Sequence, residues 1–250
     1  MIEGRKSELF YKYSCKGSPT VVFISGLGDG SDSWDGIQQE IAGIASTFAY
    51  DRAGTGKSPA VTIPCSCRDL VLELHEMLAE LAVQPPYILV GHSFGGLIAR
   101  LYAAYYPQDS SALVLVDAAA EYKEVAFEKI LPEQLLPGNR AYLENPLLNS
   151  EKIDKRLSYR QIAEASLGEP GGIPISVITR GLPDRQGADW PAEEILEVEQ
   201  LQQTGFLRLS TDGRQRFARS SGHYIHLNEP EIVIEEIRQM VELTSASYRE

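Results

Sequence analysis

Apolar residues follow two patterns along this chain. Short, nearly continuous apolar runs have the length of parallel strands buried on both faces. Longer stretches repeat their apolar residues at helical spacing. Because the two kinds of segment alternate, the pattern predicts an α/β fold with a mostly parallel central sheet and helices on both faces. The expected strands are Val21–Ile24, Thr47–Tyr50, Tyr87–Val90, Leu113–Val116, Ile175–Thr179 and Arg216–Ala218, and the expected helices are Trp34–Ile44, Arg68–Leu81, Gly95–Tyr105 and Pro230–Leu243.

The segment of residues 118–172 interrupts this alternation. It is too long for a simple crossover, and prolines at 132, 137, 146 and 170 divide it. Its short apolar pieces at helical spacing are Val125–Leu131, Leu135–Leu143 and Ile153–Leu167. We expect residues 1–250 to form one domain with an insertion of short helices at about 118–172. These helices would either cover the edge of the sheet as a lid or lie on the surface as ordinary helices.

The charge balance narrows the possible partners. The formal net charge is -12 and the isoelectric point is about 4.9, without a run of Lys or Arg. Nucleic acid and anionic membranes are therefore poor partners. No apolar stretch reaches the roughly 18 residues that a membrane span requires, and the first residues lack the apolar core of a signal peptide. We expect a cytoplasmic protein without a membrane span.

The three cysteines, Cys15, Cys65 and Cys67, do not indicate a metal site or a disulfide framework. One cysteine stays unpaired under any pairing scheme. Cys65 and Cys67 are too close for a zinc pair, and the surrounding sequence lacks His or Cys partners. We expect free thiols and no metal.

Ser93 stands at an abrupt junction between a predicted strand and a predicted helix. The stretch "LVGHSFGG" runs from strand Tyr87–Val90 into the helix without a connecting loop. A tight turn of this kind holds the serine oxygen clear of the backbone, and it needs Gly91 and Gly95 where a side chain would clash. The Phe94 N–H then lies where an oxyanion would form. The pattern G-x-S-x-G favours a nucleophilic serine, although a serine here could also only cap the helix.

A glycine-rich loop, "SGLGDG", follows the strand Val21–Ile24 and imitates a dinucleotide-binding motif. The motif G-x-G-x-x-G would require glycine at position 31, where Ser31 stands, so we expect no nucleotide and no other cofactor. The loop instead suits a second oxyanion donor, because its glycines allow close approach to the serine. The backbone N–H of Leu27 is our candidate.

Five motifs together identify a family resemblance. "FISGLGDGSDSW", "YDRAGTGKS", "PYILVGHSFGGLIARLYAAYYP", "LVLVDA" and "SGHYIHLNEPEIVIEEI" follow one another as in the α/β-hydrolase superfamily, and they resemble its small bacterial esterase-like serine hydrolases. The resemblance covers both ends of the chain and is weakest at residues 121–172, where this family inserts its lid. It implies an α/β-hydrolase fold with a small helical lid.

The resemblance also implies which histidine is the base. The family places its histidine last, in a loop after the final strand, and His223 in "ARSSGHYIHLNEP" has that position. We expect His226 to lie on the opening turn of the last helix and to serve packing or hydrogen bonding. His75 and His92 suit structural roles better, because one falls inside an amphipathic helix and the other beside the serine turn.

Two aspartates compete for the role of the acid that orients the histidine. Asp117 ends the strand after that of the serine, and Asp184 in "VITRGLPD" follows the penultimate strand. The resemblance allows either position. We prefer Asp117, because the strand that it terminates fixes it to the edge of the sheet, and we keep Asp184 as the alternative acid.

A serine, a histidine, an acid and two backbone donors suit acyl transfer to water through an acyl-enzyme. We therefore expect a serine hydrolase acting on a small acyl or ester substrate, most simply a carboxylic ester. Amide cleavage, carbon–carbon cleavage and perhydrolysis use the same groups and stay open. A ligand receptor or signalling protein on the same fold, with slow turnover, is the alternative from another class.

Overall fold

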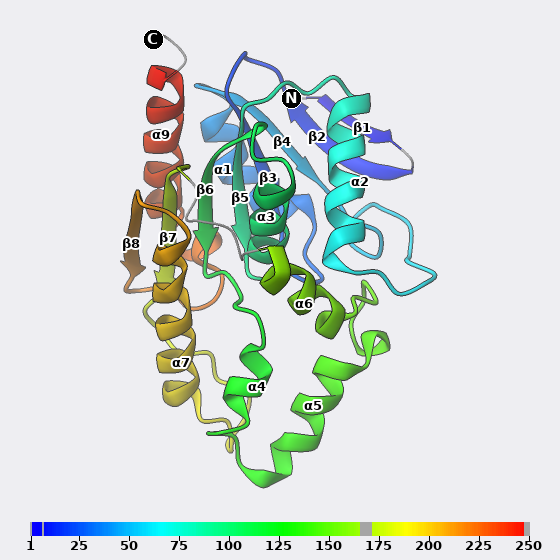
Figure 1. Ribbon diagram of the computed structural model, residues 1–250, viewed down its shortest axis with the longest axis vertical. Coiled ribbons are helices and arrows are strands. Elements are labelled where there is room, and N and C mark those ends of the chain that lie inside the picture. The colour runs from blue at the N-terminus through cyan, green and yellow to red at the C-terminus, as the bar shows by residue number, and fades with distance from the viewer. Residues whose placement is uncertain (1, 7, 166–171, 248–250) are drawn as a thin grey trace.

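The computed structural model describes residues 2–6, 8–165 and 172–247. These residues form an eight-stranded sheet in the order β1-β2-β4-β3-β5-β6-β7-β8 (Figure 1). Strands β3 to β8 run parallel to one another, whereas β2 pairs antiparallel with both β1 and β4. The strands are β1 (Ile2–Lys6), β2 (Leu9–Ser14), β3 (Thr20–Ile24), β4 (Ser46–Tyr50), β5 (Tyr87–His92), β6 (Ser110–Val116), β7 (Ile175–Arg180) and β8 (Gly213–Ala218).

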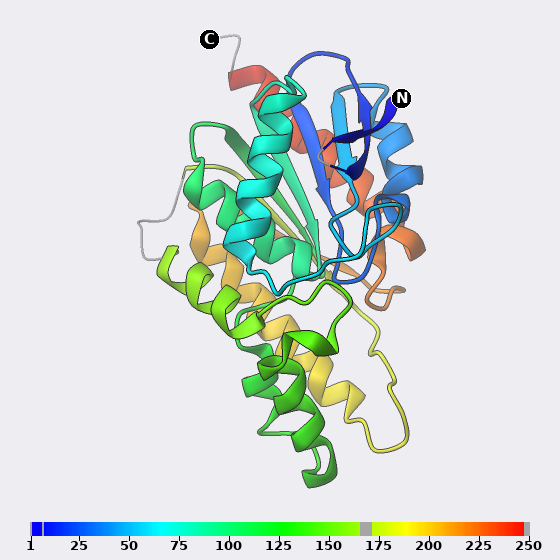
Figure 2. The same cartoon turned by 90° about the vertical axis from the view of Figure 1, so that its right-hand side faces the viewer.

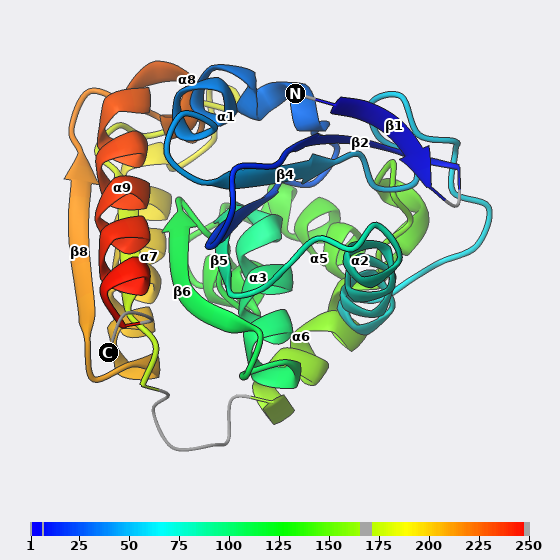
Figure 3. The same cartoon turned by 90° about the horizontal axis from the view of Figure 1, so that it is seen from above.

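Helices cover both faces of this sheet (Figure 3). One hydrophobic core joins the sheet to α2 and α3, and the other joins it to α1 and α9. The central strands are apolar and buried along their whole length, because helices exclude water from both faces. The helices are α1 (Asp35–Ile41), α2 (Cys67–Glu80), α3 (Phe94–Tyr105), α4 (Lys123–Phe127), α5 (Leu136–Glu144), α6 (Lys155–Ala165), α7 (Ala192–Thr204), α8 (Ile225–Asn228) and α9 (Pro230–Ser247).

The segment between β6 and β7 forms α4, α5 and α6. Helices α4 and α5 extend beyond the carboxyl ends of the strands (Figures 1 and 2), whereas α6 returns to the body and contacts α2 and α3. A bridge between Cys65 and Ile153 fixes the start of this return to the body. The expected helical pieces at 125–131, 135–143 and 153–167 correspond to these helices, except that the end of the third and residues 166–171 lie outside the described residues.

The predicted α/β fold is confirmed, and each predicted strand lies within an observed one. The hairpin β1–β2 and the helix α7 were not predicted. Some boundaries were wrong: the first helix ends at Ile41, the last helix continues to Ser247, and His226 belongs to the separate short helix α8. None of the helices in the described part of the chain has both the length and the apolar composition that a membrane span requires.

Candidate active site

Ser93 occupies a strained turn between β5 and α3. Its backbone angles are φ 51° and ψ −119°, a conformation that side-chain-bearing residues rarely adopt. Hydrogen bonds hold this conformation in place. The Ser93 N–H donates to Val116 O at 3.1 Å, and Ser93 O accepts from the N–H groups of Gly96 and Ala119, both at 3.0 Å. Strain that is maintained by surrounding contacts is typical of functional positions.

The glycines flanking Ser93 allow the chain to approach itself closely. A Cβ on Gly91 would lie 2.5 Å from Gly95 O, and a Cβ on Gly95 would lie 2.1 Å from Ile24 O. Both distances are far below van der Waals contact with backbone that cannot move aside. The close approach of Gly95 to Ile24 O places the start of α3 against the end of β3 and against the loop after β3, which contains Leu27.

Two backbone N–H groups are available at this junction. Phe94 is the first residue of α3, where an N–H has no acceptor within the helix. Among the described residues, neither its N–H nor that of Leu27 donates a hydrogen bond to the protein. Leu27 and Ser93 line the same cavity, where an unpaired N–H can stabilise an oxyanion.

His223 lies in the loop between β8 and α8. Its Nδ1 lies 2.6 Å from Asp117 Oδ2, and its backbone carbonyl accepts a hydrogen bond from His92 Nε2 at 3.0 Å. The ring and the main chain of His223 are therefore both held, each by a different partner. Ser93 and His223 line the same cavity, and within this described region no hydrogen bond joins the Ser93 hydroxyl to the His223 ring.

Asp117 follows β6 directly and is buried. Burial opposes its ionisation, but the hydrogen bond and charge of His223 and the charge of Arg180 hold the pKa of Asp117 well below its usual range. Arg180 Nη1 donates to Asp117 Oδ2 at 2.9 Å, and Gln203 Nε2 donates to Oδ1 at 2.9 Å. The charged carboxylate thus accepts three side-chain hydrogen bonds, which satisfies it in a dry environment.

Asp184, the alternative acid, contacts other atoms. Its Oδ1 accepts from the backbone N–H of His223 at 3.4 Å, and its Oδ2 lies 3.4 Å from Arg180 Nη1. The Asp184 side chain is 38% exposed, whereas that of Asp117 is 1% exposed. Asp117 is therefore the carboxylate that the fold brings to the imidazole of His223.

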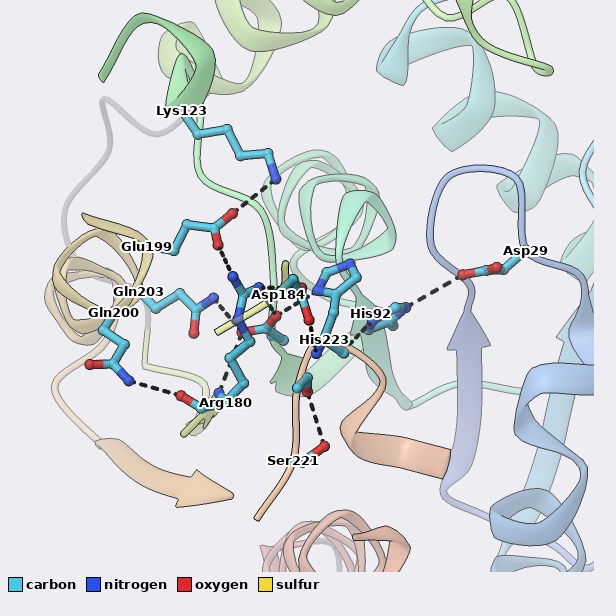
Figure 4. A network of polar contacts seen from close by, with 12 residues as sticks. Asp29, His92, Lys123, Arg180, Asp184, Glu199, Gln200, Gln203, Ser221 and His223 are labelled. Atoms are coloured by element: carbon cyan, nitrogen blue, oxygen red, sulfur yellow. Dashed lines mark hydrogen bonds and ion pairs between the residues drawn. The ribbon is translucent and has the colours of Figure 1, made fainter. Parts of the chain in front are cut away.

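A chain of ion pairs continues from Asp117 to the helices beyond the sheet (Figure 4). Arg180 Nη2 donates to Glu199 Oε2 at 2.6 Å, and Lys123 Nζ donates to Glu199 Oε1 at 3.1 Å. Burial lowers the pKa of Lys123, but the Glu199 and Glu124 carboxylates together outweigh this effect and raise it above its usual value. This chain links β7 and α7 to the start of α4.

The other histidines differ in their distance from His223. The centroid of the His92 ring lies 4.6 Å from that of His223 and 4.3 Å from that of His226. His226 is buried and stacks on Trp34, with 4.5 Å between ring centroids. Burial, assisted by the charge of His223, lowers the pKa of His226 to about 4. His75 Nδ1 lies 3.1 Å from the Tyr102 hydroxyl, and its ring stacks on Tyr106 at 3.7 Å.

A cavity of about 600 Å³ opens at Ser93 and His223, between the end of the sheet and the helices beyond it. This volume is within the range of sites for small molecules. Its walls come from α4, α5, α7 and the loop after β7. Apolar lining residues are Leu27, Phe127, Leu135, Tyr142, Trp190 and Ile195, and charged ones are Lys123, Glu124, Arg180, Asp184, Asp189 and Glu199.

Comparisons with known proteins agree with this fold. The model of the α/β hydrolase fold family matches residues 19–145, half of the chain, and the chain belongs to this family. The Bacillus subtilis protein YqjL, which is uncharacterised, is 29% identical over 226 residues, covering 90% of this chain and 85% of that protein. The protein is thus a hydrolase-fold protein by both sequence and structure.

Two solved structures show the same fold. An α/β superfamily hydrolase from Oenococcus oeni has a TM-score of 0.68 at 16% identity, covering 97% of this chain and 98% of the other. A monoacylglycerol lipase from Paleococcus ferrophilus has a TM-score of 0.64 at 20% identity, covering 94% and 99%. The predicted resemblance to the α/β-hydrolase superfamily is confirmed.

Proposed function

We propose that this protein is a serine hydrolase that cleaves a small carboxylic ester through an acyl-enzyme. Ser93 is the nucleophile, His223 the general base and acid, and Asp117 the acid that orients His223. The backbone N–H groups of Leu27 and Phe94 form the oxyanion hole. The observation that supports this proposal best is the 2.6 Å contact between His223 Nδ1 and Asp117 Oδ2 at the cavity that contains Ser93.

The hydrogen bond to Asp117 determines which nitrogen of His223 acts as the base. Because Asp117 is ionised, it accepts a hydrogen bond from the protonated Nδ1, so Nε2 carries the free lone pair. Nε2 removes the Ser93 hydroxyl proton as the serine oxygen attacks the ester carbonyl. The buried charge of Asp117 then stabilises the imidazolium that forms.

The attack creates a tetrahedral intermediate with a negative oxygen. The Leu27 and Phe94 N–H groups stabilise this oxygen, and the free N-terminus of α3 adds a positive dipole end. When the intermediate collapses, Nε2 gives its proton to the departing alcohol and the acyl group stays on Ser93. Water, activated by the same nitrogen, then releases the acid and restores Ser93.

The cavity supports a small-molecule substrate. Its apolar walls, which include Phe127 and Trp190, suit an acyl chain or an aromatic group, and Ser93 lies in the same cavity. The lipase from Paleococcus ferrophilus with the same fold acts on monoacylglycerol. We infer ester chemistry of that general kind, with α4 and α5 serving as the lid that keeps water from the acyl pocket.

Steady-state hydrolysis of nitrophenyl acetate, butyrate and octanoate tests the proposal. We expect saturable turnover by the wild type and a loss of at least about 10⁴-fold in kcat for both Ser93→Ala and His223→Ala, because members of a triad act as a unit. The matched control is His226→Ala, which removes a histidine three positions away and should retain most of the activity. Larger damage from His226→Ala, or turnover that survives Ser93→Ala, would contradict the assignment.

A further inference from the structure

Arg52, just beyond the end of β4, reaches the loop that contains Leu27. Its side chain is buried, with 1% exposed. Nη1 donates to Ser25 O at 2.8 Å, and Nη2 donates to Gly26 O at 2.6 Å. The guanidinium therefore holds two successive carbonyl groups of this loop with its rigid planar fork.

The contact with Gly26 O also fixes the Leu27 N–H. The carbonyl of Gly26 and the N–H of Leu27 belong to one planar peptide group, in which they point in opposite directions. Holding the oxygen against Arg52 therefore directs the N–H away from Arg52. A charged donor on the oxygen also polarises the peptide group and strengthens its N–H as a donor.

Glu151 holds the next peptide group of the loop. Its Oε1 accepts from the N–H of Gly28 at 2.7 Å. The same carboxylate binds Arg52 in a bidentate manner, with Nε to Oε2 at 2.6 Å and Nη2 to Oε1 at 2.9 Å. Both peptide groups that flank the Leu27 Cα are thus held by one buried ion pair.

Glu151 lies on the segment that returns from α5 to α6, 99 residues from Arg52 in the chain. Two backbone hydrogen bonds to Cys65, which lies in the body of the protein, hold this segment in place. The Cys65 N–H donates to Lys152 O at 3.2 Å, and the Cys65 carbonyl accepts from the Asp154 N–H at 2.8 Å. The orientation of the loop after β3 therefore depends on the docking of a segment from the insertion.

Stability alone does not explain this arrangement. Arg52 and Glu151 are each 1% exposed, and the cost of removing two charges from water often equals or exceeds what their attraction returns. Apolar residues of similar volume can replace such a pair without loss of stability. The hydrogen bonds to Ser25, Gly26 and Gly28 do have a geometric effect that apolar residues would not reproduce.

We propose that Arg52 and Glu151 are positioning residues that aim the Leu27 N–H at the oxyanion, and that the return segment of the insertion thereby controls the oxyanion hole. This proposal rests on the proposed serine-hydrolase function. Neither residue lines the cavity, so both act through the peptide group between Gly26 and Leu27.

Glu151→Gln tests the proposal, because glutamine keeps the shape of the side chain and removes its charge. Loss of one well-placed oxyanion donor costs about 10²–10³-fold in kcat, and we expect a misdirected donor to cost about 10–100-fold. KM should change less than about threefold, because the ester carbonyl gains its negative charge only after binding. Glu144→Gln is the control, since Glu144 belongs to the same insertion and forms an exposed pair with Arg156 at 3.1 Å.

A trifluoromethyl ketone distinguishes positioning from general weakening of the structure. Such a ketone forms an anionic tetrahedral adduct with a serine nucleophile, so its affinity reports on the oxyanion hole. We expect its inhibition constant to rise in Glu151→Gln by the same factor by which kcat falls. Glu144→Gln should leave both values unchanged.

The double variant Arg52→Met/Glu151→Leu addresses folding. With both charges replaced by apolar side chains, the melting temperature should lie near that of the wild type. The loss of kcat expected for Glu151→Gln should nevertheless persist. Recovery of both stability and kcat would overturn the proposal, as would unchanged kcat and ketone affinity in Glu151→Gln. A wild type that neither hydrolyses esters nor binds the ketone would overturn the proposed function, and this inference with it.

Discussion

Asp117 and His223 lie 106 residues apart in the chain, yet their side chains meet at 2.6 Å. Asp117 reaches this position because it follows the last residue of β6 directly and itself has a positive φ of 40°. His223 reaches it from the loop after β8, where His92 holds its carbonyl. The carboxyl ends of β6 and β8, the two strands that flank β7 in the sheet, thus supply an acid and a base to the same cavity.

The first prediction separates the two acids. Asp117→Asn keeps the side-chain shape but removes the charge that stabilises the imidazolium, so kcat should fall about 10⁴-fold. Asp184→Asn should cost less than about tenfold, because Asp184 contacts the backbone of His223 and not its ring. Ester hydrolysis of both variants, measured well below their melting temperatures, provides the comparison. The opposite order of losses would transfer the role of acid to Asp184.

Asp117→Asn should also lower stability, because Arg180 loses a buried charged partner. Arg180 keeps Glu199 and Asp184 nearby, so we expect a folded protein with an unfolding free energy lower by about 1–3 kcal/mol. Urea unfolding measures this change. A variant more stable than the wild type would show that the ion pair with Arg180 does not stabilise the fold.

The second prediction concerns acid sensitivity. Burial lowers the pKa of His226 to about 4, below the value of about 6.5 in an unfolded chain. Between these two pH values the unfolded state binds the extra proton, so the unfolding free energy falls as the pH is lowered from 7 to 4. His226 alone should contribute a loss of about 3 kcal/mol over this range.

His226→Phe should remove that contribution while keeping an aromatic ring stacked on Trp34. The unfolding free energy of the variant should still depend on pH, but less than that of the wild type, because the buried His92, whose pKa burial also lowers, is still present. Urea titrations at pH 7, 5.5 and 4.5 give the comparison. Equal pH dependence in the variant and the wild type would refute the role of His226.

The third prediction tests the close packing behind the serine turn. Gly95→Ala would place a methyl group 2.1 Å from Ile24 O, which the sheet cannot move aside. We expect a loss of several kcal/mol in unfolding free energy, or failure to fold. Gly36→Ala is the control, because this α1 glycine has open space around it, and it should gain about 0.4–1 kcal/mol. Thermal unfolding of the two proteins is sufficient to compare them.

The buried parallel strands and the serine turn could be predicted because their signals are local. Strand β5, the glycines around Ser93 and the start of α3 are contiguous in the chain, so one short stretch contains both the geometry and the chemistry. The antiparallel strand β2 is different. Only some of its side chains are fully buried, and its place in the sheet depends on pairing with β4, more than thirty residues later.

The charged residues around the site could not be predicted from local pattern. Arg180 resembles an ordinary residue at the end of a strand, and Glu199 resembles one of several acids on α7. Each is buried only because partners from distant segments neutralise it, and such pairings leave no periodic signal. The helix α7 did have a usable signal, since Pro191 precedes a run of good helix formers with apolar residues at Ile195 and Val198.

The central claim is that Ser93 is an activated nucleophile. Incubation with a fluorophosphonate, followed by intact mass measurement and peptide mapping, tests it without knowledge of the natural substrate. We predict one phosphonyl group per chain, located on Ser93, formed far more slowly in His223→Ala and absent in Ser93→Ala. A wild type that stays unmodified, or that is modified at another residue while Ser93 is unchanged, would contradict the account.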